Sequence, residues 1–396
     1  MKYQKIHIGI FGKTNVGKSS FLNKITNQDV SIVSPISGTT TDVVEKNMEL
    51  LPIGSVKFLD SAGLDDVSEL GSARIEKTEK ILTRSDIAVL ICDYNGLNDY
   101  DFNIMKKFET FSIPFIIVVN KEDEQIIEPE KLLQIKNITQ NVITTSAIND
   151  LNLICKFKDM LLNILPEDYI TEQKIVADLI PPESTVVLVT PIDKQAPKGR
   201  LILPQVQTIR DLLDDDNIVT VVKETQLNAA LNNLKTSPFI VITDSQAFKK
   251  ADEIVDKSIF LTSFSILFAR LKGDLRTFMQ GAAIIDKLED GDKVLILESC
   301  SHHAIEDDIG TVKIPNLIRK KTNKNIIFEK ISGHDLPEDL SRYKLIIHCG
   351  ACMTNRKEVL SRILLANKAN VPITNYGIAI SYCLGILDRA TKIFFN

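Results

Sequence analysis

The sequence predicts an α/β protein in which a first domain with a parallel-rich sheet is followed by two smaller α/β domains. From Lys5 to about Pro166, short apolar runs alternate with amphipathic stretches, the pattern of a parallel sheet flanked by helices. The alternation resumes twice further along the chain. With 396 residues and 44% hydrophobic content, the chain is long enough for two or three domains and a large core.

The first domain contains five apolar runs of the length that a buried strand needs. They are Ile6–Phe11, Val56–Asp60, Ile87–Cys92, Phe115–Asn120 and Val142–Thr144. Charged and proline-containing sequence from Leu165 to Pro182 then interrupts the pattern, and Pro181-Pro182 marks a linker. We therefore place the first domain at residues 1–168.

Two smaller α/β domains are predicted after this linker. For residues 169–262 we expect strands at Val186–Thr190, Ile218–Val222 and Phe239–Thr243, with helices at Val206–Leu213 and Gln226–Leu234. Residues 263–396 begin with two helical stretches up to about Leu288. Strands are then expected at Val294–Glu298, Asn325–Phe328 and Leu345–His348, and the last helices at Arg356–Ala366 and Gly377–Leu384.

Charge and cysteine content narrow the function classes. The 47 basic and 52 acidic residues give a net charge of -5, so no global positive field attracts nucleic acid or anionic lipid. Because no signal-peptide pattern or membrane-length apolar run is present, we expect a cytoplasmic protein without membrane or nucleic-acid partners. Structural disulfides are rare in that compartment, so clustered cysteines indicate metal ligands or redox groups. We expect the remaining cysteines, Cys92, Cys155 and Cys383, to be small buried hydrophobes.

A phosphate-binding motif follows the first predicted strand. Residues Gly12 to Ser19 read G-x-x-x-x-G-K-S and stand between an apolar strand and a helix, the context that this motif requires. Its glycines let backbone N–H groups surround phosphate oxygens, Lys18 reaches the β and γ phosphates, and the Ser19 hydroxyl ligates Mg²⁺. The expected nucleotide contacts from this segment are Gly12, Asn15, Gly17, Lys18, Ser19 and Ser20.

Two further strand ends carry nucleotide motifs. Asp60 ends a strand in Asp60-Ser61-Ala62-Gly63, where a carboxylate can hold Mg²⁺ through water and the Gly63 amide can meet the γ-phosphate. Asn120-Lys121-Glu122-Asp123 resembles the guanine-recognition motif of GTPases. That resemblance implies that Asn120 contacts the base edge, Lys121 packs over the ring, Asp123 accepts from guanine N–H groups, and Ser146-Ala147 backs the guanine carbonyl. We therefore expect GTP and not ATP.

The segment Gly38-Thr39-Thr40-Thr41-Asp42 resembles switch I of translation-factor-like small GTPases of the tRNA-modification type. The resemblance implies that Thr40 senses Mg²⁺, and that Asn15 binds a K⁺ ion in place of an arginine finger. Leu64 stands where Ras-like proteins carry a water-orienting glutamine. The expected catalytic residues are therefore Asn15, Lys18, Thr40, Asp60 and Gly63, with slow, K⁺-stimulated GTP hydrolysis. Alternatively, Asn15 is a plain turn former.

A Cys/His pattern follows two strands of the third domain. Cys300-Ser301-His302 comes after Val294–Glu298, and His348-Cys349-Gly350-Ala351-Cys352 comes at the end of Leu345–His348. The carboxyl ends of parallel strands lie at one sheet edge, so these side chains can converge. Thiolates select zinc or iron-sulfur clusters, and the spacing alone leaves both open.

The combination of this Cys/His pattern with a GTPase motif set resembles the FeFe-hydrogenase maturation GTPases, the HydF family. The segments Leu188–Asp193 and Ala196–Gln207 also resemble that family's middle domain, so the likeness covers nearly the whole chain. It implies a P-loop GTPase domain with a parallel-rich sheet, then a dimerisation domain and a 4Fe-4S domain with Cys300, Cys349 and Cys352 as ligands. His302, His348, an acidic side chain or water would complete the cluster.

The resemblance also implies a task. A homodimer receives a di-iron precursor from radical-SAM maturation proteins and delivers it to apo FeFe-hydrogenase. Two alternatives stay open: a tRNA-modification or ribosome-associated GTPase with a structural zinc domain, and a redox sensor that gates the nucleotide switch. The fourth cluster ligand, the composition of the cargo and the step driven by hydrolysis do not follow from the sequence.

Overall fold

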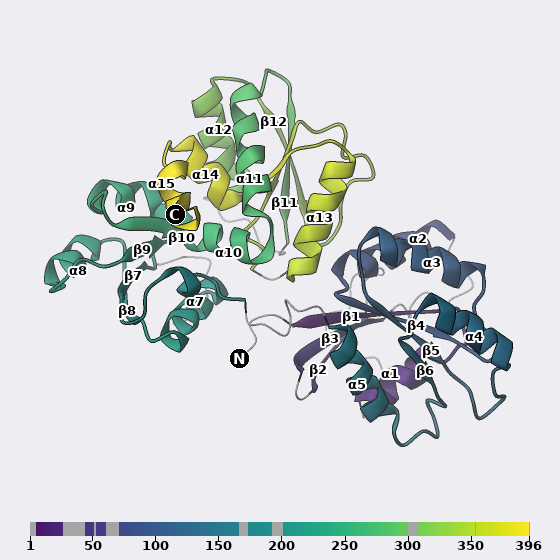
Figure 1. Ribbon diagram of the computed structural model, residues 1–396. Coiled ribbons are helices and arrows are strands. Elements are labelled where there is room, and N and C mark those ends of the chain that lie inside the picture. The colour runs from purple at the N-terminus through teal and green to yellow at the C-terminus, as the bar shows by residue number, and fades with distance from the viewer. Residues whose placement is uncertain are drawn as a thin grey trace. The chain divides into compact units, whose positions relative to one another are not determined.

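The computed structural model describes residues 5–26, 44–50, 53–60, 71–165, 173–191, 201–299, 308–352 and 354–395 (Figure 1). The chain divides into two compact units, residues 1–172 and 173–396. The predicted fold class is confirmed, since a parallel-rich P-loop sheet is followed by two further parallel sheets. The three-domain division with boundaries at 168 and 262 stays a prediction.

The first unit contains a six-stranded sheet in the order β2-β3-β1-β4-β5-β6. Only β2 runs antiparallel to its neighbour. The strands are β1 (Ile6–Phe11), β2 (Val44–Leu50), β3 (Gly54–Asp60), β4 (Ile87–Cys92), β5 (Phe115–Val119) and β6 (Val142–Thr144). The helices are α1 (Lys18–Thr26), α2 (Gly71–Arg84), α3 (Asp99–Thr110), α4 (Pro129–Ile138) and α5 (Leu153–Ile164).

Helices cover both faces of this sheet, which explains the continuous apolar runs of β1 and β4. Phe21 of α1 and Phe157 of α5 pack edge to face on one side. Phe108 of α3 joins the core on the other side. The strand β2 was not predicted from the sequence, because four of the seven residues of this edge strand are polar and it shows no apolar run.

The second unit opens with a four-stranded parallel sheet in the order β10-β9-β7-β8. Its elements are β7 (Thr185–Val189), α7 (Leu203–Asp214), β8 (Ile218–Val222), α8 (Leu227–Asn233), β9 (Ile240–Thr243), α9 (Phe248–Ile254) and β10 (Phe260–Ser263). The sequence does not predict β10, since it has only four residues and ends in Thr262 and Ser263.

A second four-stranded parallel sheet follows, in the order β12-β11-β13-β14. Its strands are β11 (Lys293–Glu298), β12 (Ile327–Ser332), β13 (Leu345–His348) and the unpredicted three-residue β14 (Ile373–Asn375). The helices are α10 (Phe264–Lys272), α11 (Leu275–Ala282), α12 (Ile314–Thr322), α13 (Arg356–Lys368), α14 (Tyr376–Cys383) and α15 (Leu387–Thr391). Short 3-10 or π turns lie at Ala177–Leu179, Ser245–Ala247, Ala283–Lys287, Ile309–Lys313 and Lys392–Phe394.

One hydrophobic core joins the two sheets of the second unit. Val187 and Val241 of the first sheet belong to the same buried cluster as Leu295 and Ile346 of the second. Helix α10 begins directly after β10, where the Ser263 hydroxyl accepts from the Ile266 amide as an N-cap. This helix therefore leads from the first sheet to the second, and its last residue, Lys272, is buried.

Within the described ranges, no helix has both the length and the apolar character needed to cross a membrane.

Candidate functional site

The P-loop adopts the backbone conformation that its glycines allow. Gly12 has φ 141° and Gly17 has φ 93°, so both lie in the region that side chains with a Cβ disfavour. The Lys18 amine is buried and donates to the carbonyls of Gly12 and Lys13, each at 3.0 Å. These contacts hold the lysine across the mouth of the loop, where β and γ phosphates are expected to lie.

Gly17, the second glycine of the P-loop, lies so close to the base-recognition loop that no side chain fits there. A Cβ on Gly17 would lie 2.2 Å from Asn120 Nδ2. The same Nδ2 donates to the Val16 carbonyl at 2.9 Å, and Asn120 Oδ1 accepts from the Ala147 amide at 2.8 Å. Asn120 thus links the P-loop to the loop that contains Ser146-Ala147. The expected contact of Asn120 with the base edge stays a prediction.

The base-recognition loop leaves Asp123 exposed to solvent. Lys121 has φ 68°, and its amine forms an ion pair with Glu124 at 3.1 Å. That hydrogen-bonded carboxylate raises the pKa of Lys121. The Glu122 amide donates to the Thr145 carbonyl at 3.2 Å and fixes this loop to the next. Asp123 is thus an accessible carboxylate, and its predicted contact with guanine N–H groups stays a prediction.

Of the other predicted nucleotide-binding residues, the structure describes some and not others. Asn15 is exposed at φ 66°, and Ser19 and Ser20 are exposed in the first turn of α1. Asp60 is buried at the end of β3, in register with Ile10 of β1. Thr40 and Gly63 lie outside the described residues. The assigned roles of all these residues stay predictions.

The two strands that precede the Cys/His segments are parallel neighbours in the C-terminal sheet, so their carboxyl ends lie at one sheet edge. β11 and β13 pair in parallel, with Leu297 opposite His348. At their carboxyl ends the Ser299 amide donates to Cys349 Sγ at 3.3 Å. Cys300 directly follows Ser299 but lies outside the described residues, as does His302. Within the described part of the chain, no group of three metal-ligating side chains is assembled.

His348 makes hydrogen bonds through both ring nitrogens. Nε2 accepts from Arg362 at 2.8 Å, since a guanidinium has only donors, and Nδ1 then donates to the Cys349 carbonyl at 2.7 Å. Arg362 also donates to Ser299 Oγ at 3.1 Å. In this arrangement His348 orients Arg362 and is not free to ligate a metal, which speaks against its predicted ligand role.

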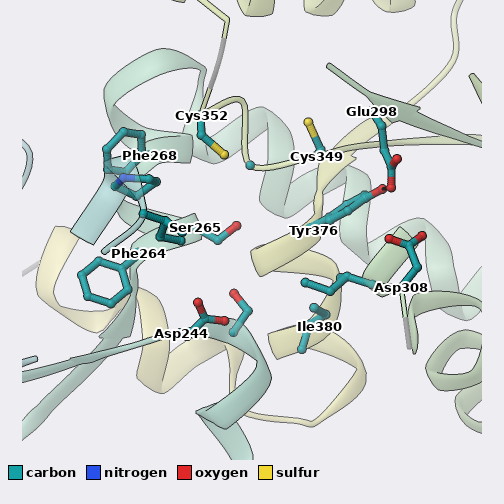
Figure 2. Close-up of a pocket in the computed structure, with 15 residues that line it drawn as sticks. Asp244, Phe264, Ser265, Phe268, Glu298, Asp308, Cys349, Cys352, Tyr376 and Ile380 are labelled. Carbon is teal, nitrogen blue, oxygen red and sulfur yellow. Dashed lines mark hydrogen bonds between the residues drawn. The ribbon is translucent and has the colours of Figure 1, made fainter. Parts of the chain in front are cut away.

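Cys349 and Cys352 both line a cavity of about 170 Å³ (Figure 2). Figure 2 shows the Ser265 hydroxyl directed toward the middle of this space. Phe264 and Phe268 of α10 form one wall, and Glu298, Asp308 and Tyr376 form the opposite wall. The Tyr376 hydroxyl donates to Glu298 at 3.0 Å. Burial raises the pKa of Tyr376, and the Glu298 charge adds to the effect, so the phenol stays protonated.

The donor set fits an iron-sulfur cluster. Two thiols at Cys-x-x-Cys spacing face a largely apolar cavity, and a third cysteine follows the neighbouring strand end. Burial raises the pKa of Cys352, and the neighbouring Cys349 raises it further, whereas Lys272 lowers it. A bound metal deprotonates such thiols outright. Cluster ligation by Cys300, Cys349 and Cys352 stays a prediction.

Sequence reasoning missed several residues of this site. Lys272 lies beneath the Cys349–Cys352 turn, Arg362 joins the two strand ends, and Ser265 and Tyr376 line the cavity. Lys272 ends an apolar helix, four residues after the buried Phe268, and this spacing was the only available hint of its burial. The three remaining cysteines, all expected to be buried, differ in exposure. Cys92 is buried and Cys383 is partly buried. The expectation for Cys155 was wrong, because this residue is exposed on α5.

Comparison with family models decides the classification. Residues 175–273 match the hydrogen maturase F dimerization domain, and residues 276–393 match the hydrogen maturase F tetramerization domain. Residues 7–121 match the 50S ribosome-binding GTPase family. The chain belongs to the hydrogen maturase F family. The resemblance to the HydF family is thereby confirmed, and the chain carries a GTPase domain.

Individual relatives match the GTPase domain. The tRNA modification GTPase MnmE of Mesoplasma florum is 37% identical over 162 residues, which are 40% of this chain and 35% of that protein. GTPase Der of Wolinella succinogenes is 37% identical over 123 residues, 30% of this chain and 26% of that protein. The chain thus spans about a quarter to a third of these relatives' length. Among solved structures, Aquifex aeolicus Era bound to GDP.AlF4- shares 22% identity, with a TM-score of 0.33 over 56% of this chain and 95% of that one.

Proposed function

We propose that this protein is a GTP-hydrolysing carrier that binds a 4Fe-4S cluster and delivers a di-iron precursor to apo FeFe-hydrogenase. The observation that carries this proposal is the pair of thiols, Cys349 and Cys352, on one cavity wall within the hydrogen maturase F domains. GTP hydrolysis acts as a switch, and the cluster site holds the cargo. Neither site supplies chemistry to the other.

GTP and Mg²⁺ bind at the P-loop edge of the first sheet. Lys18 neutralises phosphate charge, Ser19 and Thr40 ligate Mg²⁺, and Asp60 holds the ion through water. Asp123 selects guanine, with Lys121 over the ring and the Ala147 amide behind the base carbonyl. The Asn120 contacts support this assignment, because they hold the P-loop, the Asn120 loop and the Ser146-Ala147 loop beside one another.

K⁺ takes the place of an arginine finger in this proposal. Asn15 is exposed in the P-loop at φ 66°, so its side chain is accessible to an ion beside the phosphates. A cation here would stabilise charge that develops on the phosphoryl oxygens, the part that an arginine finger plays elsewhere.

The cluster is held by Cys300, Cys349 and Cys352. Three thiolates retain a cubane and leave one iron with a weaker, exchangeable ligand, for which His302, a carboxylate or water is suited. The cavity of about 170 Å³ beside Cys349 and Cys352 leaves room for an incoming complex at that position. A closed zinc site would need no such space.

A homodimer forms through β8 of the middle sheet. This edge strand leaves Ile218 57% and Val221 42% exposed, and Val206 and Leu213 of the adjoining α7 are 47% and 50% exposed. An apolar edge strand of this kind pairs readily with a second copy. The match to a tetramerization domain supports assembly beyond the predicted dimer.

Hydrogenase activation tests the proposed function. Anaerobically reconstituted wild type should be brown, and together with the radical-SAM maturation proteins it should activate apo FeFe-hydrogenase. Cys352→Ser should lose the cluster and the activation but keep GTP turnover. Cys155→Ser, on the exposed face of α5, is the matched control and should behave as wild type. A colourless, zinc-loaded wild type would instead support the tRNA-modification or ribosome-associated alternative.

A further inference from the structure

Lys272 lies directly beneath the turn that presents Cys349 and Cys352. It is the last residue of α10, and only 7% of its surface is exposed. Its amine donates to the carbonyls of Ala351 at 2.6 Å, Thr354 at 2.8 Å and Cys352 at 3.3 Å. An ammonium group has three protons and no acceptor, so this one turn satisfies all of its hydrogen-bonding capacity.

These three contacts fix the shape of the cysteine turn. Ala351 adopts φ 55°, a conformation that costs a residue with a Cβ about 1 kcal/mol or more and that the surrounding contacts must hold. Lys272 donates to the Ala351 carbonyl and also to the carbonyls of Cys352 and Thr354, which follow it in the same turn. The direction in which the turn presents its thiols therefore depends on this amine.

The hydrogen-bond partners of Lys272 do not neutralise its charge. Its hydrogen bonds go to neutral carbonyls, and its amine lies 5.4 Å from the Phe268 ring centroid. The nearby buried carboxylate Glu358 is engaged with Arg362 at 2.8 Å. A buried cation is costly unless an opposite charge accompanies it. The thiolates of the turn are the groups best placed to supply that charge.

We propose that Lys272 is a positioning residue of the metal site, which shapes the Cys349–Cys352 turn and stabilises the extra negative charge of a reduced cluster. The inference rests on the proposed 4Fe-4S site. When an external reductant donates one electron to the cluster, its net charge becomes more negative by one unit. A buried ammonium beneath the turn favours that state, because electrostatic interactions are strong where water is excluded.

The test separates charge from shape with three substitutions. Lys272→Gln keeps N–H donors without charge, Lys272→Met keeps the bulk alone, and Lys272→Arg keeps both charge and donors. Lys320→Met, at an exposed position on α12, removes one charge elsewhere in the same unit and is the control. The readout is the midpoint potential, from the electron paramagnetic resonance signal of anaerobically reconstituted protein titrated with dithionite.

At the potential where half of the wild-type cluster is reduced, the ratio of reduced to oxidised cluster should be about tenfold lower in Lys272→Gln and Lys272→Met than in wild type. This ratio corresponds to a midpoint potential about 59 mV lower for a one-electron reduction. The Arg and control variants should match wild type. Wild-type potentials in both Gln and Met variants would overturn the inference while leaving the proposed function standing. A wild type that takes up no cluster would overturn both.

Circular dichroism of the apo proteins checks that each variant is folded. If the Gln and Met variants do not fold, the folding and midpoint potential of Lys272→Arg test the proposal. A folded Arg variant with the wild-type potential supports the proposal. An Arg variant that folds no better than the Met variant overturns it, because the lysine would then act only through its shape.

Discussion

Asn120 Nδ2 donates to the Val16 carbonyl at 2.9 Å, across 104 positions of sequence. The contact joins the loop after β5 to the P-loop, and Asn120 Oδ1 extends it to the Ala147 amide. The donor Nδ2 and the acceptor Oδ1 of the Asn120 side chain thus both hold protein loops together in the described structure. Base selection is therefore expected to depend mainly on the exposed carboxylate of Asp123.

Asp123→Asn should change the preferred nucleotide. The carboxylate accepts from guanine N–H groups, and a charged hydrogen bond contributes about 1.5–3 kcal/mol, so GTP affinity should fall by roughly 10- to 100-fold. An amide can instead donate to the additional carbonyl of xanthine, so xanthosine triphosphate should become the better substrate. Competition binding with both nucleotides measures this. An unchanged preference for GTP would refute the assignment of the guanine motif.

Asn15→Ala should abolish discrimination between K⁺ and Na⁺. Wild type should hydrolyse GTP at least about tenfold faster in K⁺, a modest part of the ~10³–10⁵-fold effect of an arginine finger. Steady-state phosphate release in matched chloride salts gives the ratio for both proteins. A wild type that turns over equally fast in either salt would favour Asn15 as a plain turn former.

Val221→Lys should weaken the dimer. A lysine on the exposed edge of β8 opposes strand pairing with a second copy and leaves the buried core of the sheet unchanged. Sedimentation velocity should show a shift toward lighter species. Leu151→Lys, at a site that is 87% exposed in the first unit, is the matched control and should sediment as wild type. Identical sedimentation of all three proteins would exclude β8 as the interface.

Glu45→Gln should reduce the loss of stability in acid. Burial raises the pKa of Glu45, but hydrogen bonds from Lys57 and Arg84 outweigh this effect and lower it from 4.5 to about 2. A depressed pKa means that the stabilisation is complete above about pH 4.5 and is lost as the pH falls toward 2.

The side chain of Glu45 is 33% exposed, so after allowance for solvent screening we expect about 1–2 kcal/mol from these ion pairs. Urea unfolding of both proteins at pH 7 and near pH 3 measures the difference. The free energy of unfolding of wild type should exceed that of Glu45→Gln at pH 7, and the gap should narrow in acid. A gap that stays constant with pH would contradict this role.

The sequence predicted those strands whose burial on both faces leaves a continuous apolar run. The buried strands β1, β4 and β13 begin and end where expected, and so does β8, whose apolar run is visible although it is a partly exposed edge strand. Strands β2, β10 and β14 escaped prediction for different physical reasons. β2 is a half-exposed edge strand, while β10 and β14 have four and three residues and contain hydroxyl or amide side chains. Tertiary pairing, and not local propensity, makes these segments strands.

The site could be predicted only where its residues belong to motifs. Cys349 and Cys352 are visible as a Cys-x-x-Cys turn after an apolar strand. Lys272 is 77 residues away from Cys349 in the chain, and it meets the turn only because α10 packs beneath it. The His348 ring was a ligand candidate by its position beside Cys349. Its partner Arg362 comes from α13 and is apparent only in three dimensions.

The central claim is that three cysteines hold a 4Fe-4S cluster with one exchangeable iron ligand. Changing Cys300, Cys349 or Cys352 to serine should abolish cluster assembly, whereas the nucleotide site should keep its turnover, because every nucleotide motif ends by Ala147 in the other unit. Cys383→Ser, on α14, is the control, and this partly buried thiol should be dispensable.

Electron paramagnetic resonance of the reduced, reconstituted wild type, with and without imidazole or cyanide, tests this claim most directly. A soft or neutral donor should displace the weak fourth ligand while the three thiolates stay bound. We predict a reduced-cluster signal whose g-values shift on addition of either donor and that is lost in the three serine variants. A spectrum unchanged by both donors would show a fully ligated cluster and contradict the carrier mechanism.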